Sequence, residues 1–352
     1  MARFKVVLIE HGYASSEHER RIIAAAGGEF IDAEKRPLEE ALKLCEEADG
    51  ILFRRLTITR ELIRRFRRCK IILRYGVGTD NVDSAAATEA GIIVGHVPGY
   101  CIEEVSTQAV ALLLACVRQV VTNHKKIEAG GFDVNRYDAI HRVAGRTLGL
   151  VGLGNIGQSV ARKLGSGWGL RILATDPYVE PAKAKAAGAE LVDLETLLRE
   201  SEYVSLHAPL LPETKHLINE RTLALMKPGA ILVNTARGGV VDGGALLKAL
   251  DAGRLAAAGL DVFEEEPLPA DSPFRRHPRT VVTDHMAWYS VESQVELQTI
   301  AAQEIARVCS GGLPASLMNP EVLKKLGRFN EWQPSDVVRW QLKRMEALSP
   351  SL

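Results

Sequence analysis

Short apolar runs alternate with segments of helical periodicity over the first 95 residues of the chain. Apolar runs of strand length occur at residues 6–9, 50–53, 71–73 and 92–94. Between them, helical patterns cover residues 17–26, 38–46, 59–66 and 84–90. Strands that alternate with helices predict a parallel α/β sheet. A unit of this size is typical of a small flavodoxin-like domain.

A second alternating region follows a break at Val97-Pro98-Gly99. It begins with one long helical pattern over residues 102–128, and strand-like runs follow at 147–151, 171–175, 203–207, 230–234, 256–262 and 280–283. A last long helical pattern covers residues 290–310 and is able to return the chain to the first domain. We therefore predict an α/β protein with two Rossmann-like domains. A doubly wound domain spans residues 100–290, and the smaller flavodoxin-like domain is discontinuous over 1–99 and 291–352.

The strand at 147–151 ends in a glycine-rich turn, Gly152-Leu153-Gly154-Asn155-Ile156-Gly157. The spacing G-x-G-x-x-G between a strand and a helix is the dinucleotide-binding fingerprint. Gly152 allows the tight turn, Gly154 lets the backbone approach a pyrophosphate, and Gly157 lets the helix pack close to its strand. Asn155 and Ile156 open the helix, whose free N–H groups point at the phosphates. An ordinary glycine-rich turn is the alternative, but it does not account for the second strand and the acid that follow.

That acid is Asp176, at the end of the strand 171–175. It follows Gly157 at close to the spacing of about 20 residues expected for the carboxylate that binds a ribose 2′-OH. No Lys or Arg occurs in the next four residues, Pro177-Tyr178-Val179-Glu180. A carboxylate in this place repels a 2′-phosphate, so the sequence favours NAD over NADP. The doubly wound domain is therefore the predicted NAD-binding domain.

Composition narrows the class of protein. The chain has 352 residues, enough for about two domains, with 46% hydrophobic and 25% charged residues. Its 44 basic and 44 acidic residues cancel, which argues against nucleic acid as a direct partner. There is no apolar run of 18 residues and no signal-peptide pattern, so we expect a cytoplasmic protein without a membrane partner. The five cysteines are scattered without C-x-x-C, which predicts reduced, mostly buried thiols and no metal site.

Three later strand ends carry charged residues that suit one reaction: Arg237, Glu266 and His285. Ligands of open α/β sheets bind at the carboxyl ends of the strands. Interconversion of a 2-hydroxy acid and a 2-oxo acid needs a cation for the carboxylate, a base for the hydroxyl proton, and an acid that orients the base. An arginine fork, a histidine and a glutamate supply these functions. On spacing alone, the alternative is that the three are unrelated surface charges.

From about Val6 to Pro320 the sequence resembles the D-isomer-specific 2-hydroxyacid dehydrogenase family, and within it the branch that includes the C-terminal binding proteins and phosphoglycerate dehydrogenase-like enzymes. Five motifs carry the resemblance and occur in the family's order. They are Arg74-Tyr75-Gly76-Val77-Gly78-Thr79-Asp80-Asn81-Val82-Asp83, the fingerprint with Asp176-Pro177-Tyr178, Asn234-Thr235-Ala236-Arg237-Gly238-Gly239, Asp261-Val262-Phe263 with Glu266-Pro267, and His285-Met286-Ala287-Trp288-Tyr289-Ser290.

The resemblance implies specific site residues. It makes Arg237, Glu266 and His285 the catalytic trio of an NAD-dependent oxidoreductase, working in a cleft between the two domains. It implies that the pocket for the substrate carboxylate is lined by Arg74, Val77 and Gly78. It also implies that the substrate site is narrowed by Trp288. The cofactor contacts that it implies beyond the fingerprint are His207, Ala208, Pro209, Thr214, Thr235, Ala236 and Asp261. Family members are typically homodimers joined through their NAD-binding domains, so a homodimer is expected.

The sequence departs from the family's usual pattern at two places. Asp284 stands before His285 where the family usually has proline, and Gly243-Gly244 stand where a bulkier, often acidic residue is usual. The glycines are expected only to weaken the start of a helix. Five other histidines have no comparable context and are predicted to be solvated: His11, His18, His124, His141 and His277.

Arg54 ends the strand at 50–53 and is the most specific substrate prediction. With Arg237 and Arg74 available for the 2-carboxylate, Arg54 is predicted to bind a second anionic group, as on 3-phosphoglycerate or a 2-oxo diacid. Strand alternation predicts that Arg55 points to the other face.

The alternative for Arg54 is a solvent-facing arginine or one paired to a surface acid, and an apolar chain beside Trp288 is the rival to a second charge on the substrate. For the whole protein the alternative function is that of a dimeric, NAD(H)-binding corepressor that binds peptides.

Overall fold

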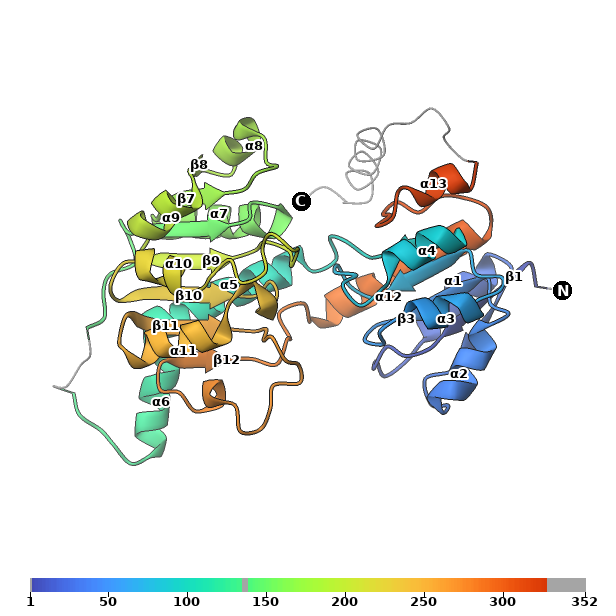
Figure 1. Ribbon diagram of the computed structural model, residues 1–352. Helices are drawn as coiled ribbons and strands as arrows, with labels where there is room; N and C mark the ends of the chain where they lie inside the picture. The colour runs from blue at the N-terminus through green and yellow to red at the C-terminus, as the bar shows by residue number, and fades with distance from the viewer. Residues whose placement is uncertain (1, 135–138, 328–352) are drawn as a thin grey trace. The chain divides into compact units, whose positions relative to one another are not determined.

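The computed structural model describes residues 2–134 and 139–327. The chain divides into two compact units, one made of Met1–Tyr100 with Ser290–Leu352 and the other of Cys101–Tyr289. Each unit is an α/β layered structure (Figure 1). The part of the predicted substrate domain after residue 327 lies outside the described residues.

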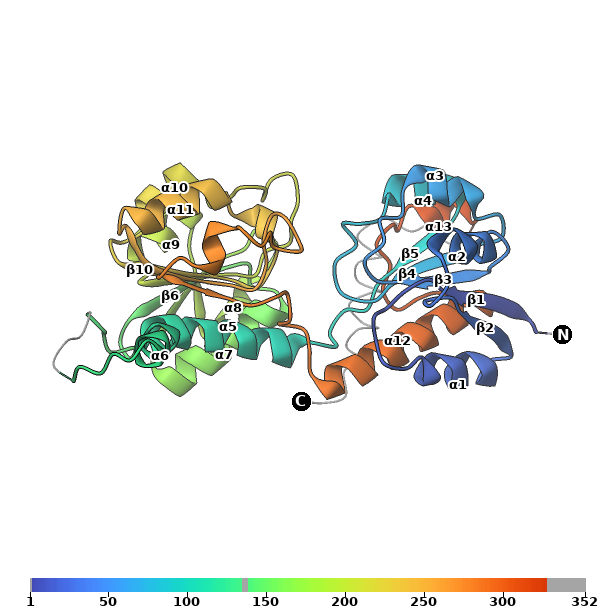
Figure 2. The same cartoon turned by 90° about the horizontal axis from the view of Figure 1, so that it is seen from below.

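The first unit contains a parallel five-stranded sheet in the order β2-β1-β3-β4-β5. Figure 2 shows α1 and α12 on one face of this sheet and α2, α3 and α4 on the other. The order 2-1-3-4-5 is that of flavodoxin-like folds, which confirms this part of the predicted fold class. The elements are β1 (Phe4–Leu8), α1 (Glu17–Ala25), β2 (Gly28–Asp32), α2 (Leu38–Cys45), β3 (Gly50–Phe53), α3 (Arg60–Arg65), β4 (Ile71–Arg74), α4 (Ser84–Ala90), β5 (Ile93–Gly95), α12 (Val291–Cys309) and α13 (Val322–Lys325).

The second unit contains a parallel seven-stranded sheet in the order β12-β11-β10-β9-β6-β7-β8. Its helices lie on both faces, with α5 and α7 on one and α9, α10 and α11 on the other (Figure 2). This is the doubly wound Rossmann arrangement, as predicted. The elements are α5 (Ile102–Val117), α6 (Val120–Glu128), β6 (Thr147–Val151), α7 (Asn155–Trp168), β7 (Arg171–Thr175), α8 (Pro181–Ala186), β8 (Ala189–Leu191), α9 (Leu194–Glu200), β9 (Tyr203–Leu206), α10 (Glu220–Leu225), β10 (Ala230–Asn234), η1 (Gly238–Val240), α11 (Gly243–Asp251), β11 (Leu255–Leu260), η2 (Pro273–Arg275) and β12 (Thr280–Val282).

The central strands are apolar along their whole length because helices cover both faces of each sheet. All five residues of β6 and all five of β10 are buried. In the second unit, β6 lies between β7 and β9, so the chain winds in opposite directions on the two sides of β6. The carboxyl ends of β6 and β9 are neighbours, since Val151 pairs with Leu206. Ligands of open α/β sheets bind at such a switch point.

The long helix predicted over residues 102–128 is wrong as one element. The structure breaks it into α5 and α6, which meet at an angle of 59°. The break occurs at Gln119, whose φ of 53° is left-handed and ends the regular hydrogen bonding of α5. In the described part of the chain, no single helix is long and apolar enough to span a membrane, although α5 and α6 together meet that test by length and composition.

The five cysteines are free and buried, as predicted.

Candidate active site

The glycine-rich turn follows β6 at the switch point of the second sheet. Gly152 has a φ of 93°, and a Cβ there would lie 2.7 Å from the backbone N of Ala208. A Cβ on Gly157 would collide with the carbonyl oxygen of Gly152. Around Gly154, in contrast, a Cβ would meet nothing within 4 Å. Gly152 and Gly157 thus permit close packing of backbone against backbone, while Gly154 leaves open space on the outer side of the turn.

Among the described residues, no side chain caps the first backbone N–H groups of α7, which lie beside that space. Gly154 is the N-cap and has no side chain with which to bond the first amides of the helix. Asn155 is exposed and Ile156 is half-buried at the first two helical positions. A helix N-terminus with free amides and a positive dipole end suits a phosphate group.

Asp176 fixes the glycine-rich turn to the end of β7. One carboxylate oxygen accepts a hydrogen bond from the backbone N–H of Leu153 at 2.8 Å. The other oxygen accepts bonds from the N–H groups of Tyr178 at 2.8 Å and Val179 at 3.1 Å. The carboxylate is half-buried and so keeps an accessible side. Its position beside the turn is suitable for a ribose hydroxyl.

The segment after β9 lies against the same turn. His207 donates its backbone N–H to Val151 at 2.7 Å, and its Nε2 lies 2.9 Å from the Ser205 hydroxyl. Burial lowers the pKa of the His207 imidazole to about 4, so the ring is neutral at physiological pH. Ala208 is buried and Pro209 is exposed. The Thr214 hydroxyl donates to the Pro209 carbonyl at 2.6 Å and thereby shapes the following turn.

The segment after β10 contains a buried polar atom that the protein does not satisfy. The Thr235 hydroxyl is buried and has no hydrogen-bond partner within the described ranges. Asn234 folds the segment, since its side chain accepts from the Ala236 N–H at 3.0 Å and donates to the Arg237 carbonyl at 2.9 Å. Buried hydroxyls are nearly always paired, so an unpaired one beside the switch point indicates a ligand contact. Together with the open space at Gly154, this fits a bound dinucleotide.

His285 and Glu266 form the central pair of the candidate site. His285 Nδ1 lies 2.6 Å from Glu266 Oε2, and the Phe263 N–H donates to Glu266 Oε1 at 2.9 Å. Burial alone would raise the pKa of the Glu266 carboxyl, but the His285 hydrogen bond and the charges of His285 and Arg237 hold that pKa below its usual value. The side chains of His285 and Glu266 are 41% and 33% exposed, so solvent and small molecules reach the pair.

Asp261 holds the loop that carries His285. Its side chain is fully buried at the end of β11. The carboxylate accepts hydrogen bonds from the Thr283 hydroxyl at 2.6 Å and from the Met286 and Ala287 N–H groups at 3.0 Å each. The Asp261 carbonyl also accepts the His285 N–H at 2.8 Å. These bonds hold His285 at a φ of 56°, a conformation that few residues other than glycine adopt.

The family resemblance implies that Asp261 contacts the cofactor, and the structure adds that its carboxylate orients the histidine loop. Thr283 was not predicted to take part, because a threonine at a strand end gives no local signal.

Three neighbours complete this part of the site. Arg237 follows β10 and donates from Nη1 to the Ala236 carbonyl at 2.7 Å. The ring of Trp288 lies edge-on to that of Tyr289, with centroids 5.5 Å apart. Asp284 is exposed, and within the described residues its carboxylate makes no contact with His285. The unusual acid beside the histidine therefore faces solvent.

In the first unit, Glu10 organises the segment after β3. Its Oε1 accepts the N–H groups of Arg54 at 2.9 Å and Leu56 at 3.0 Å, and that of Arg55 between them. The Arg54 side chain donates to the His11 carbonyl at 3.1 Å and lies over the Tyr13 ring, 5.2 Å from its centroid. Glu10 was not predicted from the sequence, because the residues whose N–H groups it accepts lie more than 40 positions later in the chain.

The predicted opposite orientation of Arg55 is wrong. A Cβ built on Gly12 would lie 2.9 Å from Arg55 Nη2 and 3.6 Å from Arg54 Nη1, so both guanidinium groups approach Gly12. Strand alternation fails here because β3 ends at Phe53 and both arginines belong to the turn that follows.

Arg74 ends β4, next to Phe53 of β3. Its Nε donates to the Arg54 carbonyl at 3.1 Å and its Nη1 to the Gly78 carbonyl at 2.6 Å. Val77 is exposed, and its carbonyl contacts Nδ1 of His96, a residue that sequence reasoning did not select. Burial lowers the pKa of His96. Arg54, Arg74, Val77 and Gly78 are thus brought together in the first unit.

The predicted solvation of His11 is wrong. Its ring is 1% exposed, and Nδ1 lies 2.8 Å from a carboxylate oxygen of Glu34. The ring packs against Tyr13 and Tyr75, with centroids 4.7 and 5.9 Å away. Glu34 compensates for Nδ1 only, since Nε2 is buried and has no hydrogen-bond partner among the described residues. This partner lies 23 residues away in the chain, so sequence patterns do not reveal it.

The predicted solvation of His277 is also wrong, because its side chain is 11% exposed and its Nε2 lies 3.3 Å from Asp251 Oδ1.

Comparison with known proteins gives a consistent result. Residues 110–287 match the family model of the D-isomer specific 2-hydroxyacid dehydrogenase NAD binding domain. The chain is 41% identical over 293 residues to a glyoxylate reductase from Korarchaeum cryptofilum, which covers 82% of this chain and 87% of that protein. It is 39% identical over 298 residues to a D-3-phosphoglycerate dehydrogenase from Methanocaldococcus jannaschii, with coverage of 84% and 56%. The chain therefore spans little more than half the length of the latter protein.

A solved structure extends the comparison to the fold. The crystal structure of a glyoxylate reductase from Paecilomyes thermophila is similar with a TM-score of 0.82 and 28% sequence identity, covering 91% of this chain and 100% of that one. These relatives are named as dehydrogenases or reductases. The alternative function as a corepressor is not supported by them.

Proposed function

Because the chain belongs to the D-isomer specific 2-hydroxyacid dehydrogenase family, we propose that it interconverts a D-2-hydroxy acid and its 2-oxo acid with NAD(H). The observation that carries the proposal is the 2.6 Å contact between His285 Nδ1 and Glu266 Oε2 at the edge of a dinucleotide-binding sheet. This contact engages Nδ1, so Nε2 is the nitrogen that exchanges a proton with the substrate oxygen. Glu266 stabilises the protonated ring through that bond.

Arg237 binds the substrate carboxylate in this proposal. Its guanidinium can donate two parallel hydrogen bonds to a carboxylate. Its positive charge also helps to lower the pKa of the Glu266 carboxyl, so it lies near the catalytic pair. The carboxylate and the proton donor thereby hold the substrate carbon in one orientation, which reduces the entropic cost of reaction. In reduction, His285 gives its proton to the carbonyl oxygen, and in oxidation it takes the hydroxyl proton.

NAD is held by the second unit. Gly152, Gly154, Gly157 and the first amides of α7 receive the pyrophosphate, and Asp176 accepts from the adenosine ribose. The remaining proposed contacts are His207, Ala208, Pro209, Thr214, Thr235, Ala236 and Asp261. When bound, the nicotinamide supplies or takes up the hydride. The unpaired Thr235 hydroxyl is the observation that supports this set from the protein's side.

The direct test is NADH oxidation with a panel of 2-oxo acids. His285→Ala should lower kcat by about 10²–10⁴ through loss of proton transfer. Arg237→Ala should raise KM as well as lower kcat, because it removes substrate binding. His141→Ala, which changes an exposed histidine of the same unit, is the control and should match the wild type. Full activity of His285→Ala across pH would show that the proton donor lies elsewhere.

We further propose that the substrate carries a second anionic group, which the Arg54 guanidinium binds. Three cations lie at the ends of the adjacent strands β3 and β4, since Arg54 and Arg55 follow β3 and Arg74 is the last residue of β4. Even with the Glu10 carboxylate on the backbone of Arg54 and Arg55, this leaves an excess of positive charge for a second anionic group. One relative is named as a D-3-phosphoglycerate dehydrogenase, which supports a phosphate-bearing substrate. The stacking of Arg54 on Tyr13 also permits a purely structural role.

The two roles of Arg54 are separated by substrate comparison. The kcat/KM values for phosphohydroxypyruvate, 2-oxoglutarate, glyoxylate and an apolar 2-oxo acid are measured in the wild type, Arg54→Ala and the exposed control Arg64→Ala. A loss confined to the two dianionic substrates supports charge recognition. An equal loss on all four, or a wild-type preference for the apolar acid, means that Arg54 does not bind a second charge.

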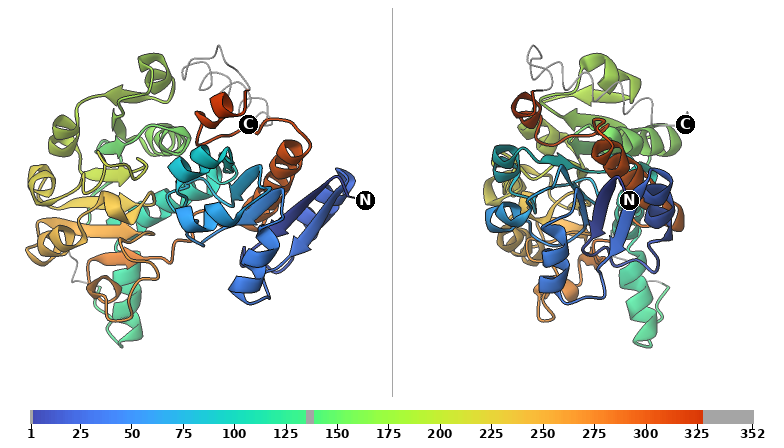
Figure 3. Two further views of the ribbon diagram at one scale, coloured as in Figure 1. Left: turned by 45° about the vertical axis from the view of Figure 1, so that its right-hand side comes forward. Right: turned by 90° about the vertical axis from the view of Figure 1, so that its right-hand side faces the viewer.

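We propose that the protein is a homodimer joined through its NAD-binding units. Helix α6 projects from its sheet (Figure 1 and Figure 3) and contains no buried residue. Val120, Ile127, Phe132 and Val134 on and after α6 are 57%, 54%, 83% and 58% exposed. Apolar residues gathered on one projecting segment support an interface. Sedimentation of the wild type and Ile127→Asp tests this, and a monomeric wild type would contradict it.

We also place the protein in the cytoplasm. The five free, buried thiols support a reducing compartment. Fractionation of cells that express the tagged chain tests this assignment.

A further inference from the structure

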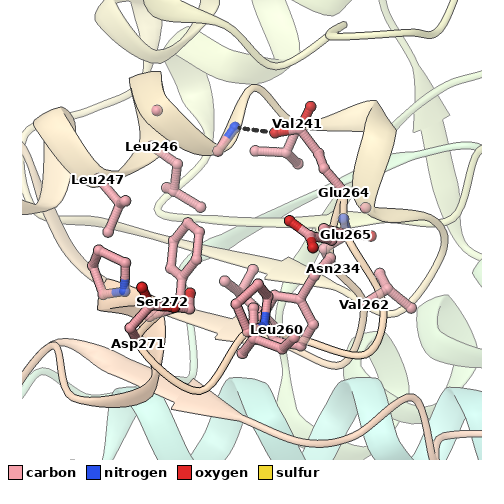
Figure 4. A pocket seen from close by; sticks show the side chains of 18 residues that line it. Asn234, Val241, Leu246, Leu247, Leu260, Val262, Glu264, Glu265, Asp271 and Ser272 are labelled. Atoms are coloured by element: carbon pink, nitrogen blue, oxygen red, sulfur yellow. Dashed lines mark hydrogen bonds between the residues drawn. The ribbon is translucent and has the colours of Figure 1, made fainter.

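A cavity of about 350 Å³ lies in the second unit beside the loop that carries Glu266. Its walls come from α11 and from residues 262–274, and Figure 4 shows Leu246 and Leu247 extending from α11 toward the strand that contains Leu260. The rings of Phe263 and Phe274, whose centroids are 6.2 Å apart, also belong to its lining. Neither Arg237, Glu266 nor His285 is among the lining residues. The proposed reaction therefore leaves this cavity unused.

Local structure keeps the cavity open at the start of α11. Gly243 and Gly244 line it without filling it. The Gly243 N–H donates to Glu264 Oε2 at 2.9 Å, and a Cβ on Gly243 would lie only 2.9 Å from the same oxygen. Glu264 Oε1 lies 2.6 Å from His216 Nε2. Glu264 is thus fixed at the wall from two sides, and the missing side chain of Gly243 provides the space that lets it approach.

The charged side chains that line the cavity are all acidic, and one cation lies nearby: Arg275 donates from Nε to the carbonyl of the lining residue Pro269 at 2.7 Å. The lining includes the carboxylates of Glu264, Glu265 and Asp271, and it includes no Lys, Arg or His. Glu265 and Asp271 are exposed at the rim. Three lining carboxylates against one neighbouring guanidinium, which already bonds to two wall carbonyls, favour a cation over a carboxylate or a phosphate as the occupant. The volume is within the range of about 300–1,000 Å³ found for small-molecule sites.

We propose that this cavity binds a small organic cation, an ammonium group attached to an aromatic or branched aliphatic group. The apolar part packs among Leu246, Leu247, Phe263 and Phe274, where burial of apolar surface drives binding. The ammonium group lies at the rim and pairs with Glu265 and Asp271. The carboxylates then select a positively charged ligand, and contact with the apolar walls provides most of the binding free energy.

Phe263 connects the cavity to the catalytic loop. Its side chain lines the cavity, and its N–H donates to Glu266 Oε1 at 2.9 Å. A ligand that shifts the Phe263 ring therefore alters the support of Glu266. This consequence for turnover rests on the proposed function, whereas binding to the cavity does not.

Binding is measured on the full chain without substrate, by calorimetry and ligand-observed NMR, so that it is independent of any activity. The probes are 2-phenylethylamine, the neutral 2-phenylethanol and the anionic 3-phenylpropanoate. We expect saturable binding in the order amine, alcohol, carboxylate. Binding of the carboxylate as tightly as the amine, or no saturable binding of the amine, would overturn the proposal.

Variants locate the site. Glu265→Gln with Asp271→Asn should weaken amine binding about three- to tenfold, as expected for two partly exposed ion pairs, and leave alcohol binding unchanged. Glu29→Gln, which alters an exposed carboxylate of the first unit, should bind both probes like the wild type. Leu247→Trp should fill the cavity and remove binding of both. Unchanged amine binding in both cavity variants would place the ligand elsewhere. An enzyme inactive on every 2-oxo acid would refute the proposed function and leave this result intact.

Discussion

His207 gives the protein a pH-dependent stability whose size follows from the structure. The ring follows β9, contacts Ser205 Oγ through Nε2, and has a pKa lowered by burial from 6.5 to about 4. In the unfolded chain the same ring titrates near 6.5. Between these two values the unfolded state binds a proton that the folded state does not. The contribution of His207 to stability is therefore complete above pH 6.5 and decreases as the pH falls toward 4.

The magnitude follows from the same two values. The pKa of His207 differs by about 2.5 between the unfolded and folded states, and below pH 4 this difference lowers the free energy of unfolding by roughly 3.4 kcal/mol. Between pH 7.5 and pH 5, the stability lost is about 2 kcal/mol. These are upper values, because His207 is half-buried in the described structure and solvent screens part of the effect.

The assay is urea denaturation of the wild type and His207→Gln at pH 7.5, 6.5, 5.5 and 5.0. The glutamine amide keeps a hydrogen bond to Ser205 but does not titrate. The wild type should lose up to about 2 kcal/mol more than the variant over this range. His141→Gln, at an exposed position, should retain the wild-type slope. Parallel pH profiles for the wild type and His207→Gln would refute the assignment of a suppressed pKa to this ring.

Three further predictions follow from other groups. Asp176→Ala should weaken NAD binding by roughly 1.5–3 kcal/mol and narrow its advantage over NADP; undiminished discrimination in cofactor titrations would contradict the ribose contact. Asp261→Ala leaves the donors of Thr283, Met286 and Ala287 unmatched and should lower stability in urea by roughly 1–3 kcal/mol for each buried donor, while Asp261→Asn should lose less. No cysteine should react with a disulfide reagent in the native protein, and all five should react after unfolding.

The sequence predicted the central strands well because their environment is uniform. Residues 147–151, 171–175 and 230–234 are apolar runs that end at Gly, Asp or Thr, and the observed strands have the same limits. It missed β2 and β8, which lie at sheet edges and pair on one side only. Strands in such positions are less apolar, so periodicity does not reveal them. The break at Gln119 has no Gly or Pro to indicate it.

The candidate site shows a similar division. Residue types and strand ends were sufficient to select Arg237, Glu266 and His285, whose catalytic roles stay predictions. The residues that these side chains contact could not be predicted from the sequence. Hydrogen bonds such as those of Asp261 to the histidine loop depend on the positions into which turns bring the backbone. The positions of His11 and Arg55 were misjudged for the same reason. Each is determined by a turn or by a partner distant in sequence.

The burial of every thiol has a practical consequence for measurement. Burial raises the pKa of Cys45, Cys116 and Cys309 to about 12, so their reactive thiolate forms are scarce at neutral pH. A cysteine introduced at an exposed position is then the one that a maleimide dye modifies. The pair Glu29→Cys and Lys248→Cys places one attachment point on each unit. Energy transfer between two such dyes can follow the separation of the units in solution without prior removal of any native residue.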